Sequence, residues 1–92
     1  MYHYSRALYR SLKDMVDPYV DRETHLTYRR AVLVSCEETL QRLAHDRRYF
    51  ARPERVLFQD IRQYFPIAHQ GRVRATIEEG VRAAMSFIDE QI

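Results

Sequence analysis

Residues 22–47 read RETHLTYRRAVLVSCEETLQRLAHDR, and no other part of the chain constrains the architecture as strongly. Neither glycine nor proline interrupts this stretch. Its apolar side chains recur every three or four residues, which is the spacing of one helical face. We therefore predict a long central helix over residues 22–47, with Asp21 as its N-cap. Its predicted buried face consists of Leu26, Tyr28, Val32, Leu33, Cys36, Thr39, Leu40 and Leu43.

A shorter helix is predicted before it, over residues 5–16. Ser5 is suited to cap its first turn, because a serine hydroxyl accepts a hydrogen bond from an otherwise unpaired backbone amide. Asp17 and Pro18 end this helix, since proline disfavours helical conformation in the preceding residue and has no amide hydrogen. Its predicted apolar face consists of Tyr4, Leu8, Leu12, Met15 and Val16.

Two more helices are predicted after it, over residues 53–65 and 69–90. Pro53 suits the first turn of the former, and Pro66 ends it. Gly80 lies inside the latter, where a glycine costs about 1 kcal/mol relative to alanine but lets a neighbouring side chain come close. The predicted buried residues are Val56, Leu57, Ile61, Tyr64 and Phe65, with Phe58 flanking, and then Val73, Ile77, Val81, Ala84 or Met85, and Ile88.

The fold class follows from these four helices. Helices of unequal length, joined by short connections and each with one apolar face, predict an all-α compact bundle that forms a single domain over residues 1–92. Two glycines and three prolines are too few for the regularly spaced turns of a β-sandwich or barrel.

Composition narrows the location and the class of partner. The longest apolar run, residues 31–34, is far shorter than the roughly 20 residues of a membrane span. The first residues lack the apolar stretch of a signal peptide, and the single cysteine excludes an intrachain disulfide. We therefore expect a cytoplasmic protein. A net charge of +2 is a weaker basic excess than nucleic-acid-binding domains usually have.

Catalytic and metal-binding patterns are missing. The chain has no Glu-x-x-His pair, no Gly-x-Ser-x-Gly turn and no glycine-rich phosphate loop. His3, His25, His45 and His69 are spread over separate helix ends and connections, and Cys36 falls on the apolar face of the central helix, which indicates a buried thiol. We expect no enzymatic activity, no cofactor and no metal.

Residues 46–66 are the strongest candidate for a binding surface. They hold five of the fourteen arginines and five of the eleven aromatic residues, and they carry the whole net charge of +2. Guanidinium groups beside aromatic rings bind phosphates, carboxylates or another protein. The candidate partner-binding residues are Arg47, Arg48, Tyr49, Phe50, Arg52, Arg55 and Arg62.

The same segment also has a structural interpretation. Tyr49 and Phe50 would fold back to close one end of the bundle, and Arg47 with its neighbour would complement the negative end of the long helix, a placement worth about 0.3–1 kcal/mol. Arg52 and Arg55 fit this interpretation less well, because a helix start disfavours positive charge. These two arginines give the best indication of a partner.

Two functions remain open at this point. The first is a small non-enzymatic protein–protein interaction or accessory module, or a homodimer. Tyr2, Tyr4 and Tyr9 favour self-association, because tyrosine is enriched in interfaces. Their alternative role is to line the edge of the core with their hydroxyls in water.

The second is a nucleic-acid-binding regulator that uses segment 47–55 or the start of the last helix. A helix-turn-helix would place Gln70, Arg72 and Arg74 on base edges. Glu78 and Glu79 follow one turn later, where a phosphate backbone would repel them.

Three stretches carry a resemblance: YHYSRALYR at residues 2–10, YFARP at 49–53 and DIRQYFP at 60–66. They are similar to small all-helical bacterial proteins, actinobacterial ones among them, whose function is unknown. The resemblance implies an all-helical fold. It implies no activity, and no functional residue is carried over from it.

Overall fold

Four α-helices make up the fold in the computed structural model, which describes residues 1–91. They are α1 (Tyr2–Leu12), α2 (Arg22–His45), α3 (Pro53–Ile61) and α4 (Gln70–Glu90). Single 3₁₀ turns follow α1 and α3, at Lys13–Met15 and Arg62–Tyr64, and another at Ile67–His69 precedes α4. No strand occurs in the described residues. The predicted all-α bundle is confirmed, with helix ends that shift by a few residues.

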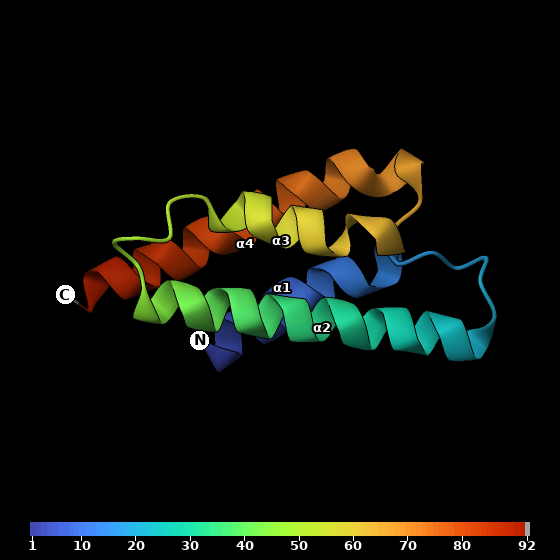
Figure 1. Cartoon of the computed structure of the whole chain (residues 1–92), viewed down its shortest axis with the longest axis horizontal. Coiled ribbons are helices and arrows are strands. Elements are labelled where there is room, and N and C mark those ends of the chain that lie inside the picture. Colours follow the sequence, from blue (N-terminus) through green and yellow to red (C-terminus); the bar gives the residue numbers. More distant parts are fainter. Residues whose placement is uncertain (92) are drawn as a thin grey trace.

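Successive helices run in opposite directions along the longest dimension of the molecule (Figure 1). α1 packs against α2 and α4, and α3 packs against the same two helices, so the four form a ring around one core. The molecule measures 45 × 22 × 18 Å. The start of α1 and the ends of α2 and α4 therefore meet at one end of the bundle (Figure 1).

The buried face of α2 is narrower than the sequence predicts. Its buried residues are Val32, Cys36, Thr39, Leu40 and Leu43. Leu26 is 50% exposed, so its assignment to the core was wrong, and Leu33 is only partly buried. A straight helix rotates a seven-residue repeat by about 20° per heptad. Leu26 lies two heptads before Leu40, so its side chain is rotated by about 40° away from the line of buried residues on α2.

The buried face of α3 is rotated relative to the prediction. Leu57, Phe58 and Ile61 are buried, whereas Val56 is 38% exposed. Val56 was thus wrongly assigned to the core, and Phe58 is a core residue rather than a flanking one. The reason is that α3 packs against α4 as well as α2. Phe58 lies on the α4 side, where the Arg74 guanidinium carbon is 4.6 Å from its ring centre.

The two predicted helix caps have different outcomes. Asp21 caps α2 as predicted, with its Oδ1 accepting a hydrogen bond from the Thr24 amide at 3.0 Å. Ser5 is not a cap, because α1 already begins at Tyr2. The Ser5 side chain is buried, and its hydroxyl donates to the Tyr2 carbonyl oxygen at 2.9 Å. The helix extends further upstream because Tyr4 packs on Phe87 of α4, with ring centres 5.0 Å apart.

Two histidines hold the far end of the bundle together. His25 Nδ1 donates to the Asp17 carbonyl oxygen at 2.9 Å, and His69 Nδ1 lies 3.4 Å from the Met15 carbonyl oxygen. The Asp17 amide donates to the Tyr64 carbonyl oxygen at 3.1 Å. The connection between α1 and α2 is thereby fixed to the connection between α3 and α4.

Gly80 lets α1 and α4 approach each other closely. A Cβ atom added at Gly80 would lie 2.7 Å from Cδ1 of Leu8, closer than packed carbon atoms allow. Leu8 is only 3% exposed and has little room to move. The close approach expected for this interior glycine is confirmed.

Candidate functional site

The connection between α2 and α3 begins with a tight turn at the end of α2. The Asp46 carbonyl oxygen accepts hydrogen bonds from the amides of Tyr49 at 2.9 Å and Phe50 at 2.8 Å. The turn sends the two neighbouring aromatic side chains to opposite sides. Phe50 is 4% exposed and Tyr49 is 82% exposed. The prediction that both close the bundle holds for Phe50 and is wrong for Tyr49.

Phe50 anchors this connection to the body of the protein. It belongs to the core, and the Arg42 guanidinium carbon lies 4.1 Å from its ring centre. Such a cation–π contact adds about 0.5–1 kcal/mol at an exposed site. Tyr49 is therefore exposed to solvent on a turn that the buried Phe50 side chain holds in place.

Arg47 has a structural partner in α4. Its Nε donates to Asp89 Oδ1 at 3.0 Å, and its Nη2 donates to Asp89 Oδ2 at 3.1 Å. This bidentate pair joins residues 42 positions apart and ties the end of α4 to the connection. Arg47 thus forms an ion pair with α4, whereas the structural interpretation of the sequence had it complement the negative end of the α2 dipole.

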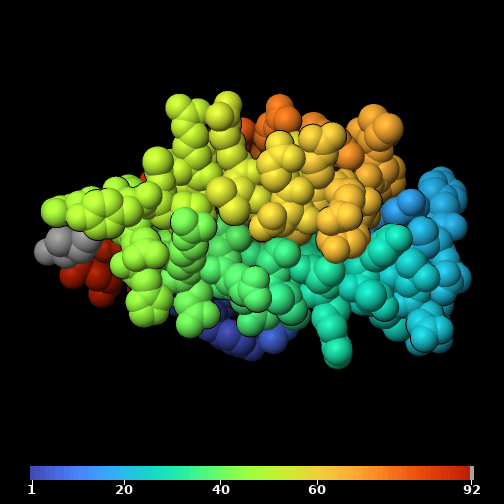
Figure 2. Space-filling view, in the orientation of Figure 1, coloured from blue at the N-terminus to red at the C-terminus, as the bar shows by residue number. Residues whose placement is uncertain are grey.

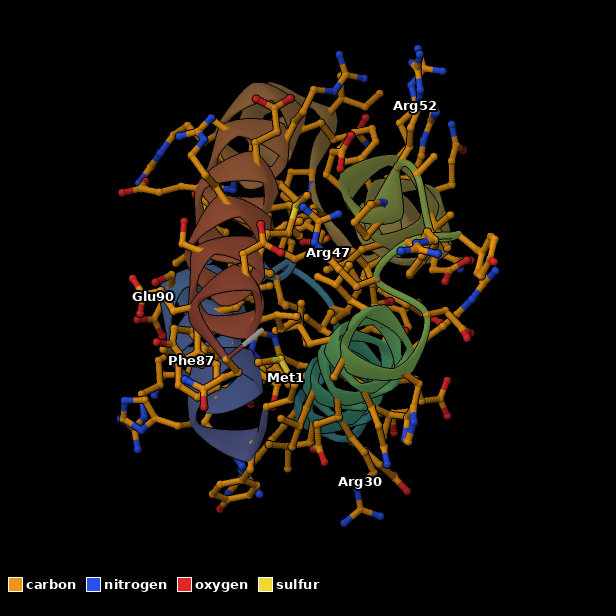
Figure 3. The ribbon with its side chains drawn as sticks, turned by 90° about the vertical axis from the view of Figure 1, so that its left-hand side faces the viewer. Met1, Arg30, Arg47, Arg52, Phe87 and Glu90 are labelled. Carbon is orange, nitrogen blue, oxygen red and sulfur yellow. The ribbon has the colours of Figure 1, made fainter. Side chains whose placement is uncertain are left out.

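The remaining candidate arginines are exposed. Arg52 precedes the first residue of α3 and its side chain makes no capping bond there. Figure 3 shows it pointing away from the helices. Arg48 and Arg55 are also exposed, and none of these three forms an ion pair within residues 1–91. Arg62 lies further along, with its guanidinium carbon 5.9 Å from the Phe58 ring centre.

Four of the seven candidate residues are therefore exposed, and we refer to them together as the arginine surface: Arg48, Tyr49, Arg52 and Arg55. In the space-filling view the yellow-green atoms of this part of the chain project beyond the neighbouring surface (Figure 2). The other three residues differ in setting. Phe50 is buried, Arg47 is paired, and Arg62 is exposed near the opposite end of α3.

A groove that the sequence did not indicate lies at the same end of the molecule. It has a volume of about 690 Å³, and we call it the end groove. Figure 3 shows Met1 between the ends of α4 and α2, with Phe87 on one side. Its apolar lining residues are Met1, Ala44, Phe87 and Ile88, and its polar ones are His45, Arg47, Arg48 and Gln91. Because the lining residues come from three separate parts of the chain, no local sequence pattern predicts the groove.

Cys36 is placed as predicted, in the core. It is fully buried, and loss of hydration raises the pKa of its thiol to about 12, with a smaller contribution from the negative charge of Glu37. A thiol in this setting is a weak nucleophile. Within residues 1–91, histidine, cysteine and carboxylate side chains form no cluster of three or more that could hold a metal ion. No helix in that part of the chain has the length and apolar character needed to cross a bilayer.

Comparison with protein family models, curated proteins and solved structures finds no match to this chain.

Proposed function

We propose that this protein is a small non-enzymatic interaction module whose contact surface is the arginine surface. The observation that carries the proposal is Tyr49, which is 82% exposed on a turn anchored by the buried Phe50. Tyrosine and arginine are the residue types most enriched among those that dominate binding energy in interfaces. A tyrosine held in a fixed turn also loses little conformational freedom on binding.

The charges of this surface favour a partner that presents carboxylates. Arg48, Arg52 and Arg55 have no ion pair within residues 1–91, whereas Arg47 beside them is paired with Asp89. Arg52 and Arg55 also lie at the positive end of the α3 dipole, so an acidic partner would relieve an unfavourable placement.

A second copy of this chain fits the arginine surface less well. A two-fold axis through it would bring the arginines of the two copies together. Among the N-terminal tyrosines, Tyr2 is 69% exposed, while Tyr4 and Tyr9 pack partly against the core. We therefore propose an accessory role beside a different protein, with a homodimer through the tyrosines as the alternative form.

The test uses the double variant Arg52→Glu, Arg55→Glu. We expect it to lose a partner that the parent protein captures from cells of its source, while its midpoint of thermal unfolding stays the same or rises, because the α3 dipole favours negative charge at the helix start. Arg30→Glu, a charge reversal on the exposed face of α2, is the matched control and should retain the partner. Capture by the double variant as strong as by the parent would refute the assignment of this surface. Light scattering over a range of protein concentrations tests the homodimer.

The nucleic-acid alternative draws on the same residues, since an exposed tyrosine between arginines can stack on a base while the guanidinium groups bind phosphates. A helix-turn-helix version has less support, because α3 and α4 run antiparallel (Figure 1), whereas that motif crosses its helices steeply. Binding to single-stranded DNA would weaken with salt by about 0.7 log units per neutralised phosphate for each log unit of salt. Absence of binding at low salt would exclude this alternative.

A further inference from the structure

The end groove combines an apolar floor with basic side chains. Met1, Ala44, Phe87 and Ile88 supply the apolar part. Its volume of about 690 Å³ falls within the range of small-molecule sites, which are mostly apolar with a few polar groups that orient the ligand.

The charged side chains that line the end groove are two arginines, Arg47 and Arg48. Among residues 1–91 its lining also includes His45 and no carboxylate, and the nearby Asp89 pairs with Arg47 from outside the lining. Two other grooves, of about 520 and 430 Å³, are each lined by both glutamate and arginine side chains. The end groove is therefore the one of these three whose charge favours an anion over a cation.

Arg48 is the residue best suited to hold that anion. Asp89 already bonds two nitrogens of Arg47, so most of the Arg47 charge is neutralised. Arg48 is exposed and has no ion pair within residues 1–91. His45, on the last turn of α2, is a second hydrogen-bonding side chain in the lining.

We propose that the end groove binds a fatty acid, with its alkyl chain on the apolar floor and its carboxylate at Arg48 and His45. This ligand matches both halves of the groove, because it joins one apolar chain to one negative charge. Each methylene group that leaves water strengthens binding by up to about fourfold, so affinity rises with chain length while the chain remains on the floor. The proposal is independent of the protein-interaction proposal, although both use Arg48.

The test compares two probes that share a ten-carbon chain and differ in charge: decanoate and decyltrimethylammonium. Each is titrated below its critical micelle concentration into ¹⁵N-labelled protein that carries no added residues at either end. We expect decanoate to shift the backbone amide signals of residues 44–48 and 87–91, and to bind more weakly as its chain is shortened to octanoate. The cationic probe should bind about two- to fivefold more weakly or not at all.

Two pairs of variants locate the site. Ala44→Trp places a large ring over the floor and should remove decanoate binding, whereas Ala75→Trp, at another exposed helical alanine, should leave it unchanged. Arg48→Ala should weaken binding about two- to fivefold, and Arg30→Ala should not. The double variant Arg52→Glu, Arg55→Glu should still bind decanoate, which separates this proposal from the previous one.

Three results would overturn the proposal. They are no amide shifts with decanoate, equal binding of the two probes, and decanoate binding that survives Ala44→Trp in a folded protein. Shifts at the same amides on raising the protein concentration without ligand would mean that a second copy occupies the groove, and would also overturn it.

Discussion

Replacing Gly80 with alanine tests the closest helix–helix contact of the fold. Two opposing effects act at this position. Alanine is favoured over glycine inside a helix by about 1 kcal/mol. Against this gain, the new methyl group would lie 2.7 Å from Leu8 Cδ1 and 3.3 Å from both Cδ2 and Cγ of the same side chain. Leu8 is 3% exposed, so it cannot move aside without displacing the core.

The size of the effect follows from these two terms. Adding a methyl group to a packed core costs about 1–3 kcal/mol. After subtraction of the helical gain, Gly80→Ala should lower the free energy of unfolding by about 0–2 kcal/mol. Gly71→Ala is the matched control, because a Cβ atom there meets nothing within 4 Å. It should raise the free energy of unfolding by up to about 1 kcal/mol.

Urea unfolding followed by circular dichroism measures both variants. The two should differ by about 1–3 kcal/mol, or several degrees or more in Tm for a chain of this size. A double-mutant cycle with Leu8→Ala gives the sign of the coupling. Leu8→Ala alone should cost about 2–5 kcal/mol, and the double variant should cost less than the sum, because the added methyl group then occupies vacated space. If Gly80→Ala stabilises the protein as much as Gly71→Ala does, the close packing of α1 on α4 is refuted.

The remaining predictions concern the core thiol and the connection after α2. With a pKa of about 12, only about one Cys36 thiol in ten thousand is ionised near pH 8, so iodoacetamide should label it only when the protein is unfolded; rapid labelling of folded protein would contradict its burial. Phe50→Ala should cost about 3–5 kcal/mol in urea unfolding and Tyr49→Ala less than about 0.5, and similar costs would mean that the turn does not separate the two rings. A double-mutant cycle between Arg47 and Asp89 should give a coupling of about 0.2–1 kcal/mol that decreases in high salt, and a coupling unaffected by salt would exclude an exposed ion pair.

The sequence was sufficient to predict the elements of this fold, because each helix is marked by signals within itself. Pro18 and Pro66 lie in connections, Pro53 begins α3, and Asp21 caps α2, as their local chemistry requires. The apolar spacing of α4 was also enough to predict its buried residues Val73, Ile77, Val81 and Ala84, although Ile88, which was predicted with them, is only partly buried. Such signals depend on neighbours in the chain, and they can be interpreted without knowing what packs on them.

Which face of each helix is buried was harder to predict, since it depends on which neighbouring helices pack on each side of it. The apolar spacing of α2 fits both a face that includes Leu26 and one that does not. Contact with α1 and α3 selects the second. At that end of α2, His25 bonds the Asp17 carbonyl oxygen, and the predicted Tyr28 packs against Tyr64 with ring centres 4.9 Å apart and planes tilted by 43°. Val56 and Phe58 show the same dependence on α4.

The candidate site shows why composition alone could not separate binding residues from structural ones. In the sequence, Arg47 and Arg48 are neighbours of one type, as are Tyr49 and Phe50. In the fold, Arg47 is paired with a carboxylate 42 residues away and Phe50 lies in the core, while Arg48 and Tyr49 are exposed and Arg48 has no ion pair within residues 1–91. A tight turn at Asp46 makes this division. The functional candidates are therefore the arginines and the tyrosine whose side chains make no structural contact within residues 1–91, and the variants that remove them should change binding without destabilising the fold.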